Sequence, residues 1–127
     1  MTDTYFETVE QIIRSNPLVV SHNLQVNHTS PSTAYLKGEL LFTDGTWLAV
    51  FQHIRTNETG PLITDYRYHY MTDEKQMIFR YDNAPHHSEI STFPNHKHLP
   101  SGVYASDMPD FKDVMDEITD IIIGKMI

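Results

Sequence analysis

The chain has 127 residues, no cysteine, and a formal net charge of −8 when histidine is counted as neutral. This length favours a single domain over residues 1–127 with a real hydrophobic core, and the lack of cysteine excludes disulfides, thiolate zinc sites and a cysteine nucleophile. No apolar run approaches the roughly 20 residues of a membrane span, so we expect a cytoplasmic protein with no membrane partner.

The first predicted element is a helix that opens at a capping box on Thr4 and ends before Asn16-Pro17. Its apolar positions recur at helical spacing: Phe6, Val9, Ile12 and Ile13. Residues 18–26 alternate like a β-strand, and the polar residues 27–32 indicate a loop.

Residues 35–54 form the clearest hairpin pattern in the chain. Asp44-Gly45 is typical of a two-residue type I′ turn, which would pair Phe42 with Trp47. In that register both faces of the hairpin are partly apolar. We therefore expect helices on one face and a partner on the other, and a homodimer is one such arrangement.

A second hairpin is predicted over residues 62–82, with Met71 opposite Gln76. Alternation then separates an aromatic face from a charged face. The aromatic face, which we expect to lie in the core, carries Tyr66, Tyr68, Tyr70, Met77, Phe79 and Tyr81. The charged face carries Asp65, Arg67, His69, Arg80 and Asp82. In this register Arg67 would face Arg80 directly, a repulsion that diagonal contacts to the aspartates could relieve.

Residues 83–103 are rich in proline and histidine and show little periodicity, which is typical of a long loop that is either functional or disordered. Asp107 is expected to cap a C-terminal amphipathic helix. The apolar stripe of that helix comprises Phe111, Val114, Met115, Ile118, Ile121 and Ile122. The predicted fold class is α+β, with an N-terminal helix, an antiparallel sheet of about five strands built from hairpins, and the C-terminal helix.

The negative charge is unevenly distributed along the chain. Residues 67–98 hold four bases and four acids, so they are neutral, and they contain five of the eight histidines. Residues 107–120 hold six acids and one lysine, a charge of −5. An acidic total argues against nucleic acid as a partner. Protonation of the histidines at about pH 6 to 7 would nevertheless make residues 67–98 positive, so an anionic substrate is not excluded.

Three stretches of the histidine-rich segment form a distinctive pattern. They are Tyr66-Arg67-Tyr68-His69-Tyr70, Phe79-Arg80-Tyr81-Asp82-Asn83-Ala84-Pro85-His86-His87 and Thr92-Phe93-Pro94-Asn95-His96-Lys97-His98. This pattern resembles the signature of the TumE toxins, small proteins of bacterial and archaeal toxin–antitoxin modules. The resemblance covers about residues 33–120 and implies toxicity and a cognate antitoxin as partner. Members of that family often carry an acidic residue where this chain reads Val50-Phe51-Gln52-His53.

The leading functional hypothesis is metal-independent RNA cleavage, in which the RNA 2′-hydroxyl attacks the adjacent phosphate. Histidine can act as general acid or base near neutral pH, and arginine and lysine stabilise the charge of a pentavalent phosphate. The expected catalytic residues are His69, His86, His87 and Asp82. The expected substrate-binding residues are Arg67, Arg80, Lys97 and Asn83.

Two other interpretations of the same segment remain. His96 and His98 lie two residues apart and could bind a divalent metal such as zinc together with Asp82, although the leading hypothesis requires no cofactor. In the other interpretation the loop is structural, with Asp82-Asn83 forming an Asx-type turn, and the protein is a non-catalytic binding module.

Overall fold

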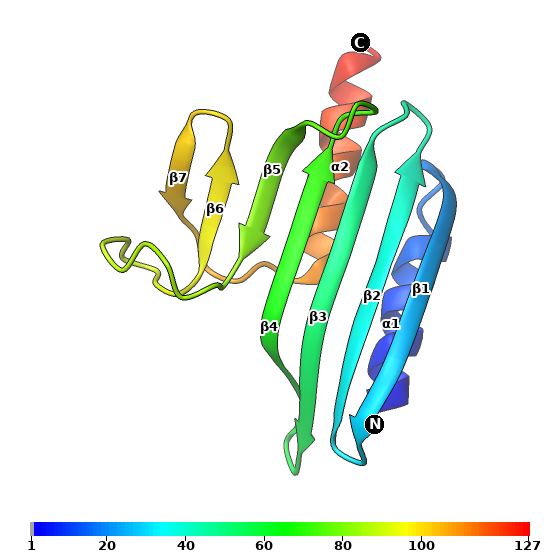
Figure 1. Cartoon of the computed structure of the whole chain (residues 1–127). Helices are drawn as coiled ribbons and strands as arrows, with labels where there is room; N and C mark the ends of the chain where they lie inside the picture. The colour runs from blue at the N-terminus through cyan, green and yellow to red at the C-terminus, as the bar shows by residue number, and fades with distance from the viewer. Residues whose placement is uncertain (1) are drawn as a thin grey trace.

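The structure, a computed structural model, describes residues 2–127, and their side chains from Thr4 onward. Two helices, α1 (Thr2–Arg14) and α2 (Phe111–Lys125), lie on the same side of one antiparallel sheet (Figure 1). Among the described residues no helix covers the other face. We call the uncovered side the open face. Neither helix is long and apolar enough to cross a membrane.

The sheet has seven strands, and their order in space is their order in the chain. They are β1 (Val19–Ser30), β2 (Thr33–Phe42), β3 (Trp47–Asn57), β4 (Gly60–Met71), β5 (Met77–Asp82), β6 (His96–Leu99) and β7 (Gly102–Ala105). The α+β class is thus confirmed, but the expected number of about five strands is wrong. Part of the predicted loop forms the hairpin β6–β7, and β1 extends through residues 27–30, which we expected to be irregular.

The core lies between the helices and the inner face of the sheet. The two helices bury Phe6, Val9, Ile13, Phe111, Val114, Met115, Ile118 and Ile122, at the spacing of three and four residues that their sequences predict. The aromatic side chains of β4 and β5 are buried beneath them, as expected. The helix starts differ from the prediction, because α1 already includes Thr4 and α2 follows Asp110, not Asp107.

The turn of the first hairpin is one residue longer than predicted. Phe42 donates its N–H to the carbonyl of Thr46, so the loop has three residues, and Gly45 takes a left-handed φ of 86°. Trp47 therefore pairs with Leu41, not with Phe42. This slip exchanges the faces of β3, so Leu48, Val50 and Ile54 are buried on the inner face, while Trp47 and Phe51 lie on the open face. The open face therefore remains partly apolar, as the sequence predicted.

The second hairpin is also shifted from its predicted register, but by two residues. Its turn again has a three-residue loop, with Lys75 in the left-handed conformation at φ 65°. A register irregularity between Tyr70 and Met71 adds the second residue of the shift. A shift of two keeps each side chain on its predicted face and gives Arg67 the partner Asp82 instead of Arg80. The expected facing of like charges is therefore absent.

Candidate functional site

The strand registers align residues into rows that cross the open face of the sheet. One row comprises Gln25, Lys37, Phe51, Arg67, Asp82 and His96. The neighbouring row comprises Asn23, Glu39, Ala49, His69, Arg80 and His98. Together the rows gather titratable residues of β4, β5 and β6 into one patch.

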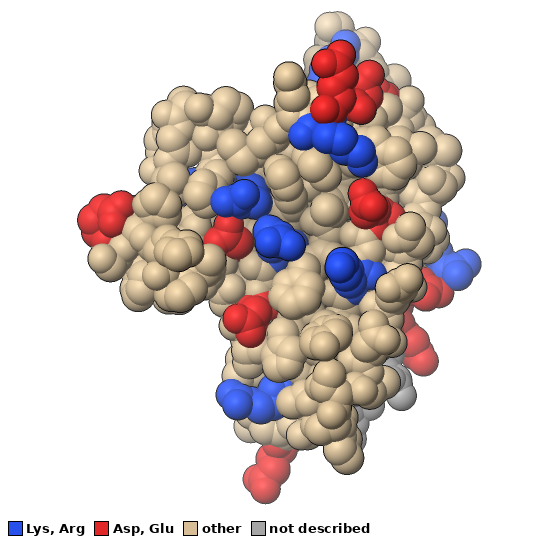
Figure 2. All heavy atoms as spheres, in the orientation of Figure 1, with Lys and Arg blue, Asp and Glu red and all other residues tan. Residues whose placement is uncertain are grey.

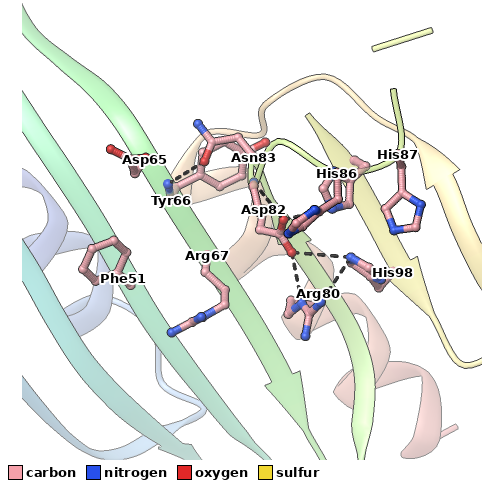
Figure 3. A pocket seen from close by; sticks show the side chains of 12 residues that line it. Phe51, Asp65, Tyr66, Arg67, Arg80, Asp82, Asn83, His86, His87 and His98 are labelled. Atoms are coloured by element: carbon pink, nitrogen blue, oxygen red, sulfur yellow. Dashed lines mark hydrogen bonds and ion pairs between the residues drawn. The ribbon is translucent and has the colours of Figure 1, made fainter. Parts of the chain in front are cut away.

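Asp82 is the centre of this patch, and it is buried although it carries a carboxylate. One carboxylate oxygen lies 2.9 Å from Nε2 of His96 and accepts the backbone N–H of Ala84 at 3.1 Å. The other accepts a hydrogen bond from Nε of Arg80 at 3.0 Å and lies 3.5 Å from Nε2 of His98 (Figure 3). The contact with Ala84 is that of the expected Asx-type turn. The remaining contacts anchor three side chains on one anion.

His96 has a hydrogen-bond acceptor at each ring nitrogen. Its Nδ1 lies 2.9 Å from the carbonyl oxygen of Pro94, and its Nε2 faces the carboxylate of Asp82. A carbonyl and a carboxylate can only accept, so both ring nitrogens donate and the ring is an imidazolium paired with Asp82. The His96 side chain is only 3% exposed, which makes this a buried ion pair beneath the site.

His98 is in a different state from His96. Its Nε2 lies 3.2 Å from Nη2 of Arg80, and because a guanidinium nitrogen can only donate, Nε2 must accept and the ring is neutral. Burial lowers the pKa of His98, and Arg80 lowers it further, while Asp82 acts in the opposite direction. His98 therefore offers a neutral imidazole near pH 7, the form that a general base requires.

A pocket of about 420 Å³ opens over this cluster, between the open face and the loop that follows β5. The sheet contributes Phe51, Asp65, Tyr66, Arg67, Arg80, Asp82, His96 and His98, and the loop contributes Asn83, Ala84, His86 and His87. His87 has a left-handed φ of 61°, and its ring centroid lies 5.8 Å from that of His98. The structure thus brings together most of the residues that the sequence nominated, from four different segments.

Asn83 lines the pocket, but its side-chain amide already bonds to the backbone of β4. Its Oδ1 accepts the N–H of Tyr66 at 3.1 Å, and its Nδ2 donates to the carbonyl of Thr64 at 2.9 Å. This pair of bonds fastens the start of the loop to the neighbouring strand. Asn83 therefore positions the loop that carries His86 and His87.

His69 lies on the open face but outside the pocket lining. Its register partner is Arg80, whose other neighbour is His98, so Arg80 separates the two histidines. Within residues 4–127, Nε2 of His69 is a buried nitrogen without a hydrogen-bond partner. Burial lowers the pKa of His69, and Arg80 and Arg67 lower it further.

Lys97, predicted to bind substrate, lies on the other side of the sheet from the pocket. It follows His96 in a strand, so alternation turns it toward the helices, where its Nζ lies 2.8 Å from a carboxylate oxygen of Glu117. Burial would lower its pKa, but hydrogen bonds to Glu117 and Tyr81 raise it overall. The structure therefore separates Lys97 from the two arginines with which the sequence grouped it.

The metal hypothesis can be tested against the donor set. Asp82, His96 and His98 offer ligand atoms within 4.8 Å of one another. However, Arg80 bonds to both Asp82 and His98, and each ring nitrogen of His96 has an acceptor. A metal ion would have to displace a guanidinium and deprotonate His96, so the arrangement fits a resident arginine better than a metal.

Two residues of the site were not nominated for these roles from the sequence. Phe51 lines the pocket, but the predicted register placed it on the same face as Leu36, Leu40 and Phe42, which the structure buries. His98 was grouped with His96 as a metal ligand, and only the contact with Arg80 distinguishes the two histidines. Alternation along β6 was the available signal, since it sets His96 and His98 apart from Lys97.

A comparison with known protein families matches nearly the whole chain. The family model described as toxin TumE matches residues 9–126, which is nearly the whole chain and includes every residue of the pocket. No curated protein and no solved structure matches the chain. On the strength of the family match, the chain belongs to the TumE toxin family.

Proposed function

We propose that this TumE-family toxin is an endoribonuclease that cleaves RNA without a metal ion. The observation that carries the proposal is the contact between Arg80 and Nε2 of His98, at 3.2 Å, in a pocket that also holds Arg67. It sets a neutral base beside two permanent cations, which are the groups that a phosphate ester needs for cleavage by its own 2′-hydroxyl.

The proposed reaction is an internal transfer at phosphorus. As Arg80 turns its N–H from Nε2 of His98 to the phosphate, that nitrogen accepts the proton of the 2′-hydroxyl. The 2′-oxygen forms a bond to phosphorus while Arg67 and Arg80 stabilise the added negative charge. A protonated His86 or His87 donates a proton to the leaving 5′-oxygen as its bond to phosphorus breaks. The products are a 2′,3′-cyclic phosphate and a 5′-hydroxyl end. His69, predicted as an acid or base, has no role in this scheme because it lies outside the pocket lining.

The test is RNA cleavage by purified toxin in the presence of EDTA, free of any antitoxin. His98→Ala is expected to lower kcat by about 10²–10⁴-fold, the usual contribution of a general base. His22→Ala, an exposed histidine of β1, is the matched control and should leave cleavage unchanged. Equal cleavage by both variants, or no cleavage by the wild type, would refute the proposal.

A second candidate function uses a divalent metal at Asp82, His96 and His98, and the closeness of their ligand atoms favours it. In that case cleavage stops in EDTA and returns with one added metal, and metal analysis finds an ion that survives dialysis. The arginine-based mechanism expects full cleavage after chelation. The two candidates therefore give opposite results in one assay.

An antitoxin is the proposed protein partner, because toxins of such modules are held inactive by one. A non-catalytic toxin would also need this partner, so toxicity in cells separates the alternatives. Growth inhibition that persists in His98→Ala would indicate a toxin that acts by binding. Loss of inhibition in His98→Ala but not in His22→Ala would support catalysis.

A further inference from the structure

A second groove, of about 380 Å³, continues from the pocket along the open face. Phe51 and Arg67 line both the pocket and the groove, so the two are contiguous. From there the groove crosses β3 and β2 and reaches the edge strand β1. Its lining includes Asn23, Gln25, Lys37, Glu39, Phe51 and Arg67, and we call it the strand groove.

The strand groove follows one of the rows that the registers define. Gln25 pairs with Lys37, Lys37 with Phe51, and Phe51 with Arg67, which in turn pairs with Asp82 beneath the pocket. Neighbouring strands lie about 4.8 Å apart, so these four steps cover about 19 Å. The row therefore connects the edge of the sheet with the proposed reaction centre.

Three consecutive side chains of this row are cationic, aromatic and cationic, namely Lys37, Phe51 and Arg67. Lys37 and Arg67 are exposed and, within residues 4–127, take part in no ion pair. Figure 2 shows that basic side chains cross this face, with isolated acidic side chains between them. Phe51 lies between them, with the Tyr35 ring 6.3 Å away between centroids. Glu39 is the acidic residue of the groove, and its carboxylate lies 3.5 Å from Nζ of Lys75.

We propose that the strand groove binds single-stranded RNA and leads it into the pocket, a proposal that rests on the proposed function. One base stacks on Phe51, and the phosphates on either side of it contact Lys37 and Arg67. Flat unpaired bases stack on aromatic rings, and flanking cations track the backbone. The bases of a duplex are paired and stacked on one another, so they cannot use Phe51 in this way.

Binding can be measured apart from cleavage by using a fluorescent 12-nucleotide strand of 2′-O-methyl RNA, which has no 2′-hydroxyl to react. Fluorescence anisotropy is expected to show that Phe51→Ala raises Kd about tenfold and that Phe51→Trp restores binding. Lys37→Ala should raise Kd and reduce the slope of log Kd against log salt by about 1. The same strand annealed to its complement should bind more weakly to the wild type.

The matched controls lie on the other side of the sheet or on a helix. Tyr104→Ala removes an exposed aromatic ring of β7, and Lys112→Ala removes an exposed cation of α2. Neither should change Kd for the strand. Circular dichroism checks that Phe51→Ala is folded. Lys37 is exposed, so Lys37→Ala tests binding in the groove without a change in the core.

The outcomes distinguish failure of the groove from failure of the nuclease. If the wild type cleaves RNA but Lys37→Ala and Phe51→Ala bind the strand with the same Kd as the wild type, the groove proposal is wrong and the nuclease proposal stands. If the wild type binds the strand but cleaves no RNA, and both variants bind the strand more weakly, the groove proposal is supported and the nuclease proposal is wrong. If the wild type does not bind the strand and both variants fail to bind the antitoxin, the open face is a protein interface and the groove proposal is overturned.

Discussion

Removal of the Asp82 carboxylate would test the buried ion pair on which the site depends. Asp82→Ala leaves the imidazolium of His96, with its side chain only 3% exposed, without its anion, and it removes an acceptor from Arg80. Removal of one partner from a buried pair costs about 3–5 kcal/mol of unfolding free energy. In the double variant Asp82→Ala/His96→Ala no unpaired charge remains between them, so we expect a coupling of about 0.5–3 kcal/mol.

Urea unfolding provides the measurement, because the chain has one tryptophan, Trp47, as a fluorescent reporter. With m-values of about 1–3 kcal/mol/M, a loss of about 4 kcal/mol lowers the midpoint by about 1–4 M. Asp116→Ala, an exposed aspartate of α2, should change the unfolding free energy by less than about 0.5 kcal/mol. If Asp82→Ala costs under about 1 kcal/mol, or if the double variant is strictly additive, the assignment of an imidazolium–carboxylate pair is refuted.

The remaining predictions concern the pH profile, the packing of β2 against β1, and the lysine of β6. Because Arg80 lowers the pKa of His98, activity should fall as pH drops through that lowered pKa, and Arg80→Gln should move this limb of the kcat/KM profile to higher pH. An unchanged limb would contradict the role of His98. A Cβ at Gly38 would collide with the β1 backbone, so Gly38→Ala should cost about 1–3 kcal/mol in urea unfolding. Gly124→Ala, with open space around its Cβ position, should cost nothing, and equal losses would contradict the collision. Lys97→Met should cost about 1 kcal/mol of stability and leave the Kd for RNA unchanged, whereas a tenfold rise in Kd would contradict its placement away from the pocket.

The helices and the aromatic core could be predicted from the sequence because their apolar residues recur at regular intervals over long segments. The registers did not, since each depends on local backbone geometry at a turn. Lys75 adopts a left-handed conformation that a lysine in the sequence does not predict. A second irregularity lies before this turn, between Tyr70 and Met71. The strands β6 and β7 have four residues each and lie among prolines and histidines, so the alternation of His96, Lys97 and His98 alone did not predict a strand.

The membership of the site was easier to predict than the roles of its residues. The density of histidine and arginine marked the segment that lines the pocket, and the residues expected on the charged face of β4 and β5 do lie on one face. His96 and His98 look equivalent in sequence, yet Pro94 and Asp82 make one a donor at both nitrogens while Arg80 makes the other an acceptor. Such states depend on partners across strands, which spacing alone cannot supply.

The agreement between strand order and chain order has a consequence for how the toxin is made. Each strand pairs with the one synthesised just before it, so the sheet can grow hairpin by hairpin from β1 as the chain leaves the ribosome. The residues that line the strand groove, from Asn23 to Arg67, all precede His96 and His98 in the chain. If the proposed function holds, a nascent toxin would carry the residues of the strand groove before it contains His98, the proposed base, and could become active only once β6 has paired with β5.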